Sequence, residues 1–137
     1  MIKKTVWVTI VVFVVWTIMD FIIHSVLLHS VYHDTADLWR PEEEMNMPLM
    51  SLVTLVFTAC FVSIYSFLVE PKSLASGIKY GSIFGLATGT SMGFGSYGYM
   101  PIPLSLAFSW FVGTLIETIL AGAIVGLMIR APEEHKA

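Results

Sequence analysis

The chain has 137 residues, of which 56% are hydrophobic and 12% are charged. A soluble domain has roughly 25% charged residues, so the composition excludes an ordinary soluble protein and indicates a single membrane domain. Seven basic residues against ten acidic ones provide no basic surface for nucleic acid. The lone cysteine, Cys60, forms no internal disulfide, so cysteine usage does not indicate the compartment.

The first apolar segment covers residues 5–28, which is long enough to cross a hydrocarbon core of about 30 Å. It follows Lys3 and Lys4, as in a signal peptide, but it is longer than the apolar stretch of such a peptide and no small-residue cleavage site follows it. We therefore expect a retained helix. Residues 32–47 then form a polar loop, in which Pro41 and the glutamates after it predict a short interfacial helix.

Three further spans are predicted, at about 48–69, 74–99 and 104–129. With four spans the loops alternate between two sides, and the basic residues sort with them: Lys3, Lys4, Lys72, Lys79, Arg130 and Lys136 lie on one side and Arg40 on the other. Basic residues gather on the cytoplasmic side of membrane proteins, so we expect a multi-pass protein of the cytoplasmic (inner) membrane with both termini cytoplasmic. The predicted fold is all-α, a four-transmembrane-helix bundle with a short interfacial loop or helix after the first span.

The third span carries a glycine at every fourth position: Gly77, Gly81, Gly85, Gly89 and Gly93. Each glycine inside a helix costs about 1 kcal/mol relative to alanine, whereas rows of small residues are the usual packing surface between membrane helices. The spacing therefore predicts a glycine zipper. Because four residues exceed one helical turn, the row drifts by about 40° per glycine, and we expect it to wrap around the helix and contact two neighbours.

The fourth span has its own row of small residues at four-residue steps, in which Glu117 takes the place of one member. The row consists of Ser105, Ser109, Gly113 and Ala121. The connection between the third and fourth spans is short, so these helices are expected to be antiparallel neighbours. We therefore expect Gly113 and the Glu117 carboxyl group to lie against the glycine helix.

Three ionisable residues fall inside predicted spans: Asp20, His24 and Glu117. Such residues cost about 2.5 to 3.5 kcal/mol on insertion scales and are functional hypotheses by default. Asp20 and His24 are four residues apart and share a helical face. We expect the three to converge inside the bundle as a structural hydrogen-bonded group, as a proton-sharing carboxyl pair with a histidine, or as ligands of a divalent metal such as zinc or copper.

His29 and His33 extend this site only if the first helix ends near Leu28, because on a straight helix they point away from Asp20 and His24. Otherwise they are interfacial residues without a ligand, or they form a zinc or copper site on the outer surface together with the acidic and methionine side chains of the loop. No nucleophile and base pattern or phosphate loop is present in the sequence, and no catalytic residue is predicted.

The chain length, the four predicted spans, the loop at residues 38–41, the glycine helix and Glu117 together resemble small four-helix bacterial integral membrane proteins of unknown function. The resemblance implies the fold and no activity. Asp20, His24 and His29 are also similar to the Asp and His copper ligands on a membrane helix of the C subunit of particulate methane and ammonia monooxygenases. Here the third residue stands closer to the second, and the rest of the chain departs from that subunit.

These patterns lead to two main hypotheses of function. The first is a non-enzymatic bundle that acts as a homo-oligomer or as an accessory subunit of a membrane complex, because a wrapping glycine row offers more packing surface than one partner helix covers. The second is a small proton- or metal-ion-binding or transporting protein that uses Asp20, His24 and Glu117. A membrane enzyme with a metal at the same residues is a third alternative.

Overall fold

The computed structural model describes residues 1–130, and every regular element within that range is a helix. Three helices are long and apolar enough to cross a membrane. They are α1 (Ile2–Asp20) with its π-helical continuation η1 (Phe21–Leu27), α3 (Met47–Leu68) and α5 (Leu104–Met128). They match the spans expected at 5–28, 48–69 and 104–129 and, by their length and composition, indicate a membrane protein. Lys136, expected on the cytoplasmic side, lies outside the described residues.

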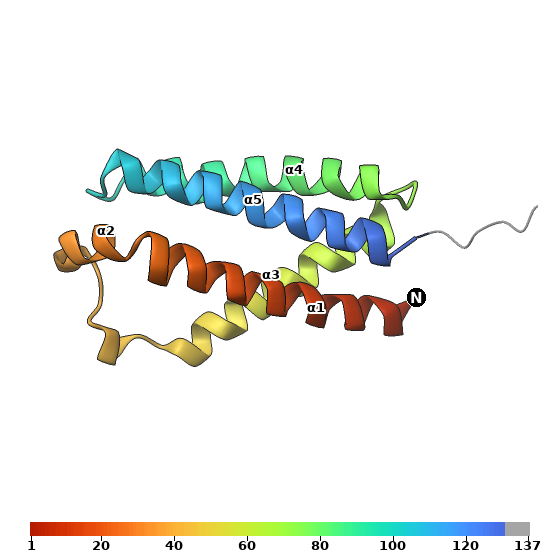
Figure 1. Cartoon of the computed structure of the whole chain (residues 1–137), viewed down its shortest axis with the longest axis horizontal. Helices are drawn as coiled ribbons and strands as arrows, with labels where there is room; N and C mark the ends of the chain where they lie inside the picture. Colours follow the sequence, from red (N-terminus) through yellow and green to blue (C-terminus); the bar gives the residue numbers. More distant parts are fainter. Residues whose placement is uncertain (131–137) are drawn as a thin grey trace, which may run out of the picture.

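The helix with the glycine row, α4 (Leu74–Thr90), has 17 residues and continues as the π-helical segment η4 (Ser91–Gly95). The expected third span at 74–99 is thus helical, but it is not among the three helices of membrane-crossing length and apolarity. Helices α4 and α5 lie side by side and run in opposite directions (Figure 1). This antiparallel pair agrees with the short connection between them.

The bundle has two ends, visible in Figure 1. The loop end carries residues 29–46, and the terminal end carries the N-terminus and Arg130. Three short pieces form the loop end: α2 (His29–Asp34), η2 (Ala36–Leu38) and η3 (Glu42–Glu44). The last begins directly after Pro41, where a short helix is expected, and it is a single 3-10 turn.

Backbone contact joins α4 to α5. All five glycines of the row are buried, and an added Cβ at each would collide with or press on atoms of α5. At Gly81 it would lie 2.9 Å from the carbonyl carbon of Thr118 and 3.1 Å from the Cα of Gly122. The expectation that the row contacts two neighbours is therefore wrong. The row lies against one partner helix, α5, over its whole length.

The face of α5 that meets α4 differs from the expected one. Ala107, Phe111, Thr118, Gly122 and Gly126 approach the glycine row. Gly113 instead faces α1, where its added Cβ would lie 3.3 Å from Cδ1 of Ile23, and Glu117 lines a cavity with residues of α1. The expectation of Gly113 and Glu117 against the glycine helix is wrong because a different row of α5, offset around the helix by about 100° per residue, meets the glycines.

The main core fills the terminal half of the bundle. Its buried side chains are Val8, Val12, Trp16, Phe61, Val62, Tyr65, Ala121, Val125 and Ile129. Only the second half of α3 contributes to it, since residues 47–57 are exposed apart from the half-buried Thr54. Helix α3 crosses α1 obliquely (Figure 1), and it leaves α1 and α5 uncovered toward the loop end.

A smaller core holds the loop end together. Buried Leu28 packs with Ile102, Leu106, Ala107 and Trp110, and the half-buried Tyr32 and Trp39 lie against this group. The indole rings of Trp39 and Trp110 are 6.0 Å apart. This cluster fixes α2 and η2 on the first turns of α5. The polar sequence between the first two spans is therefore an ordered cap.

Candidate functional site

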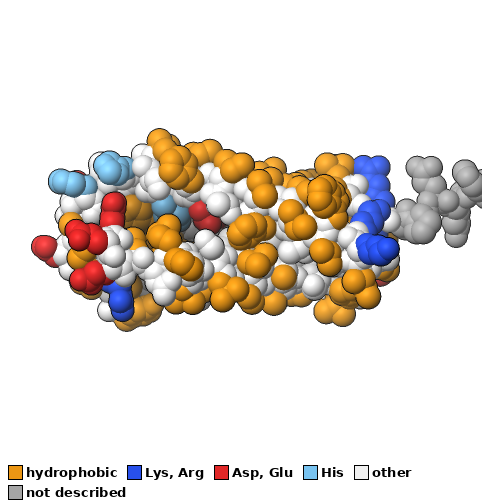
Figure 2. All heavy atoms as spheres, turned by 90° about the horizontal axis from the view of Figure 1, so that it is seen from below, with side chains coloured by type: hydrophobic (Ala, Val, Ile, Leu, Met, Phe, Trp, Pro, Cys, Tyr) orange, Lys and Arg blue, Asp and Glu red, His pale blue; other side chains and the backbone are white. Residues whose placement is uncertain are grey.

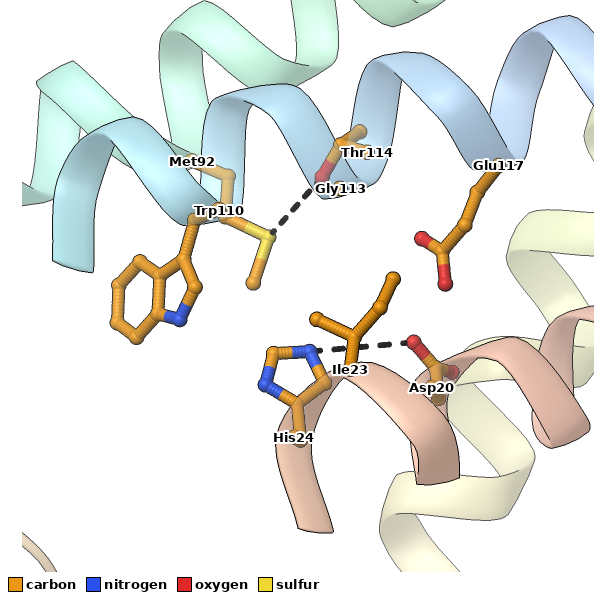
Figure 3. Close-up of a pocket in the computed structure, with 8 residues that line it drawn as sticks. All are labelled: Asp20, Ile23, His24, Met92, Trp110, Gly113, Thr114 and Glu117. Atoms are coloured by element: carbon orange, nitrogen blue, oxygen red, sulfur yellow. Dashed lines mark hydrogen bonds and ion pairs between the residues drawn. The ribbon is translucent and has the colours of Figure 1, made fainter. Parts of the chain in front are cut away.

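A cavity of about 40 Å³ lies between α1 and α5, on the side of the main core nearer the loop end. Its lining residues are Asp20, Ile23, His24, Met92, Trp110, Gly113, Thr114 and Glu117 (Figure 3). A cavity needs about 10 to 15 Å³ to hold a water molecule, so one to three waters fit. The surface around the site is mostly apolar. Figure 2 shows a histidine and an acidic side chain among hydrophobic side chains on this face.

Two π-helical segments border the cavity. Segment η1 begins directly after Asp20 and carries Ile23 and His24, and η4 carries Met92. In η1 the amide of Leu28 donates to the carbonyl oxygen of Ile23, five residues back, over 2.9 Å. Such wide turns occur often at functional sites. Here they set the directions in which the His24 and Met92 side chains leave their helices.

The three predicted intramembrane residues are brought together. Nε2 of His24 lies 4.0 Å from Oδ1 of Asp20, which is beyond hydrogen-bond distance. The carboxyl groups of Asp20 and Glu117 point toward one another from α1 and α5 (Figure 3). One oxygen of Glu117, Oε1, is buried without a hydrogen-bond partner in the described part of the chain. Two carboxyl groups and an imidazole thus converge on one water-sized space.

His24 has a second partner on its other ring nitrogen. Its Nδ1 lies 2.6 Å from the phenolic oxygen of Tyr32, and Nε1 of Trp110 donates to the same oxygen over 2.7 Å. The sequence does not indicate this role for Tyr32, since an aromatic residue near a membrane surface is typically a headgroup anchor. The separation of eight residues becomes a contact only because the helix breaks at Leu28, whose φ of −100° and ψ of 7° are not helical.

Tyr32 is in its neutral form at this position. Burial raises the pKa of the Tyr32 phenol above its ordinary value, while the hydrogen bond from Trp110 acts in the opposite direction. A raised phenol pKa keeps the hydroxyl protonated throughout the physiological range. The hydroxyl therefore has one proton to donate and lone pairs to accept.

His29 and His33 lie outside this site. The helix does break at Leu28, as their participation requires, yet both side chains are exposed. Nδ1 of His33 lies 3.6 Å from Oδ1 of Asp34, with side chains 82% and 79% exposed, and such surface pairs contribute little. Among residues 1–130 no three His, Cys, Asp or Glu side chains are arranged to hold a metal ion. The zinc and copper hypotheses gain no support from this geometry.

Comparisons of the chain with protein families, with curated proteins and with solved structures found no match. The functional argument therefore depends on the arrangement of the side chains around the cavity.

Proposed function

We propose that this protein is a four-span inner-membrane protein in which Asp20 and Glu117 bind and release protons, with His24 as the neighbouring proton carrier. The observation that supports it is the convergence of two carboxyl groups and an imidazole on one cavity of water size. Intramembrane ionisable groups are expensive and mark proton and ion pathways in many membrane proteins. Two facing carboxyl groups cannot both ionise easily, so the pair holds a proton between them.

The size of the cavity favours a proton over an organic substrate. Pockets for small organic molecules usually measure about 300 to 1,000 Å³, whereas this one measures about 40 Å³. Waters fit it, and waters carry protons between groups too far apart for a direct hydrogen bond. The 4.0 Å gap between His24 and Asp20 is such a distance.

The four-span topology is part of the proposal. Together α4 and η4 run over 22 residues, Leu74–Gly95, which corresponds to about 33 Å of helix and matches a hydrocarbon core of about 30 Å. They lie beside α5 (Figure 1). Lys and Arg side chains gather at the terminal end and acidic ones at the loop end (Figure 2). This separation favours a cytoplasmic terminal end.

Infrared difference spectroscopy tests the proton site directly. We expect the protein in lipid vesicles to show the band of a protonated carboxyl group that disappears between acid and alkaline buffer. Glu117→Gln removes one partner of the pair, so it should abolish this band and any proton uptake into the vesicles. The exposed loop variant Glu42→Gln is the matched control and should keep both. An unchanged spectrum and unchanged uptake in both Glu117→Gln and Asp20→Asn would refute the proposal.

A second candidate is that the protein is a homo-oligomer or an accessory subunit. Its support is the exposure of the Asp20 and His24 side chains, 44% and 34% in the isolated chain, inside a span where contact with lipid is costly. A second copy or another subunit over this opening would remove that cost. The glycine row no longer argues for such a partner, because α5 covers it.

The mass of the protein after gentle extraction in native lipid discs tests the second candidate. We expect a dimer or a larger complex, and the opening beside Asp20 should be its interface. Asp20→Leu makes this surface apolar and compatible with lipid, so it should increase the monomeric fraction. A wild-type protein that is monomeric by mass would contradict this candidate and leave the proton site untouched.

A further inference from the structure

The phenolic oxygen of Tyr32 joins two spans and the loop end at one atom. Tyr32 belongs to α2, and its partners are Nε1 of Trp110 on α5, at 2.7 Å, and Nδ1 of His24 on η1, at 2.6 Å. The rings of Tyr32 and His24 are 5.8 Å apart and inclined by 32°. The ring of Trp39 packs edge-on against Tyr32 at 5.5 Å, so the phenol is held from three directions.

The chemistry of these three groups determines where the protons lie. An indole N–H is a donor only, and a phenol has one proton and accepts through its oxygen. Trp110 therefore donates to Tyr32, and the phenol keeps its own proton for another partner. The only other polar group at hydrogen-bond distance from this oxygen, among residues 1–130, is Nδ1 of His24. Nδ1 then accepts, and a neutral imidazole carries its proton on Nε2.

The opposite arrangement leaves one group unsatisfied. If Nδ1 of His24 carried the proton and donated it, the oxygen of Tyr32 would accept twice and its own hydrogen would have no acceptor in the described part of the chain. A donor that gives up its hydrogen bond to water on folding and finds no other acceptor is destabilising. That cost favours the arrangement in which Tyr32 donates.

We propose that Tyr32 is the positioning residue of the intramembrane site: held by Trp110, it donates to Nδ1 of His24 and thereby fixes the neutral imidazole with its proton on Nε2, toward Asp20. The groups that face His24 are Asp20 from its own helix, Tyr32 from α2, and Trp110 and Glu117 from α5. Within residues 1–130, only the Tyr32 oxygen lies at hydrogen-bond distance from Nδ1. The role of this imidazole orientation in proton transfer rests on the proposed function. The orientation of the His24 imidazole itself can be tested without that proposal.

Nitrogen NMR of the full chain in lipid bilayers, with ¹⁵N-labelled histidine, tests this assignment. The His24 signals are those that disappear in His24→Gln. At alkaline pH, where the imidazole is neutral, we expect a protonated Nε2 and an unprotonated, hydrogen-bonded Nδ1. Tyr32→Phe removes the hydroxyl that donates to Nδ1. The Nδ1 signal should then shift to that of an imidazole nitrogen without a hydrogen bond, and the tautomer with its proton on Nδ1 should become populated. Trp110→Phe removes the donor that holds the phenol in place, so the hydrogen bond from Tyr32 to His24 should weaken and the Nδ1 signal should shift in the same direction.

Tyr99→Phe is the matched control. It removes the hydroxyl of another tyrosine, one that is 78% exposed, so the His24 signals should stay as in the wild type. A wild-type His24 with its proton on Nδ1 would overturn the proposal. So would identical His24 signals in the wild type and Tyr32→Phe; if that variant does not fold, the same comparison with Trp110→Phe decides. Loss of the carboxyl band in Glu117→Gln is measured separately, so each proposal fails independently.

Discussion

Gly81→Ala is expected to push α4 away from α5 and to lower the free energy of unfolding in detergent by about 3 kcal/mol, the upper part of the usual range for overpacked sites. The new Cβ would lie 2.9 Å from the carbonyl carbon of Thr118 and 3.1 Å from the Cα of Gly122. Both atoms belong to the backbone, and no side-chain rotation relieves the overlap. Because the neighbouring glycines of the row meet α5 in the same way, a local shift would disturb the contact along its length.

Gly95→Ala is the matched control for this experiment. Gly95 also lies on the glycine-rich helix, yet its added Cβ would find its nearest neighbour, the carbonyl oxygen of Thr90, at 3.9 Å. That is ordinary contact, and a glycine replaced without strain usually gains about 0.4 to 1 kcal/mol. Thermal unfolding of both variants, followed by circular dichroism, should therefore move in opposite directions. Equal stability of Gly81→Ala and the wild type would contradict the backbone contact.

Glu117→Met is expected to raise the stability of the folded protein while it abolishes proton binding. Oε1 of Glu117 is buried without a partner, and an unsatisfied buried polar atom costs about 1 to 3 kcal/mol. Methionine is flexible, fills irregular gaps and removes that cost together with the carboxyl group. Functional sites commonly reduce stability in this manner.

The measurement is thermal unfolding of Glu117→Met in lipid or detergent, with Ile116→Met as the control. Ile116 is the adjacent residue and is 52% exposed, so its replacement should leave the unfolding temperature near that of the wild type. A lower unfolding temperature for Glu117→Met would mean that the carboxyl group stabilises the bundle. Glu117 would then be a structural residue, as one of the initial hypotheses holds.

Hydropathy was sufficient to predict the three long helices, because a run of apolar residues of that length has few alternatives to crossing a membrane. The spacing of Asp20 and His24 likewise placed both on one face of a helix. The prediction was wrong about which face of α5 meets the glycine row, and a rotation by one residue was enough to give Glu117 a different neighbour. Glu117 and Thr118 are adjacent and about 100° apart, and Thr118 faces the glycine row while Glu117 faces α1.

Tyr32 and Trp110 could not be assigned to the site from the sequence. Their contact joins residues 78 positions apart, and it depends on the break at Leu28 and on the wide turns of η1. Neither feature has a clear signal in the residues, since no proline or glycine marks the end of the first helix. Aromatic residues near a membrane surface are typical headgroup anchors, and only the tertiary structure identifies these two as hydrogen-bond partners.

The packing of α3 is uneven along its length, and this divides the molecule into a rigid and a compliant half. Its second half belongs to the main core, whereas its first half, residues 47–57, is exposed apart from the half-buried Thr54 and packs inward only at its end, where the ring of Phe57 lies 5.4 Å from that of Trp16. Regions with few buried contacts open locally at a much smaller free energy than global unfolding. Local opening of the first half of α3 would therefore leave the main core intact, and it would also leave the carboxyl pair undisturbed, because no residue of α3 lines the cavity.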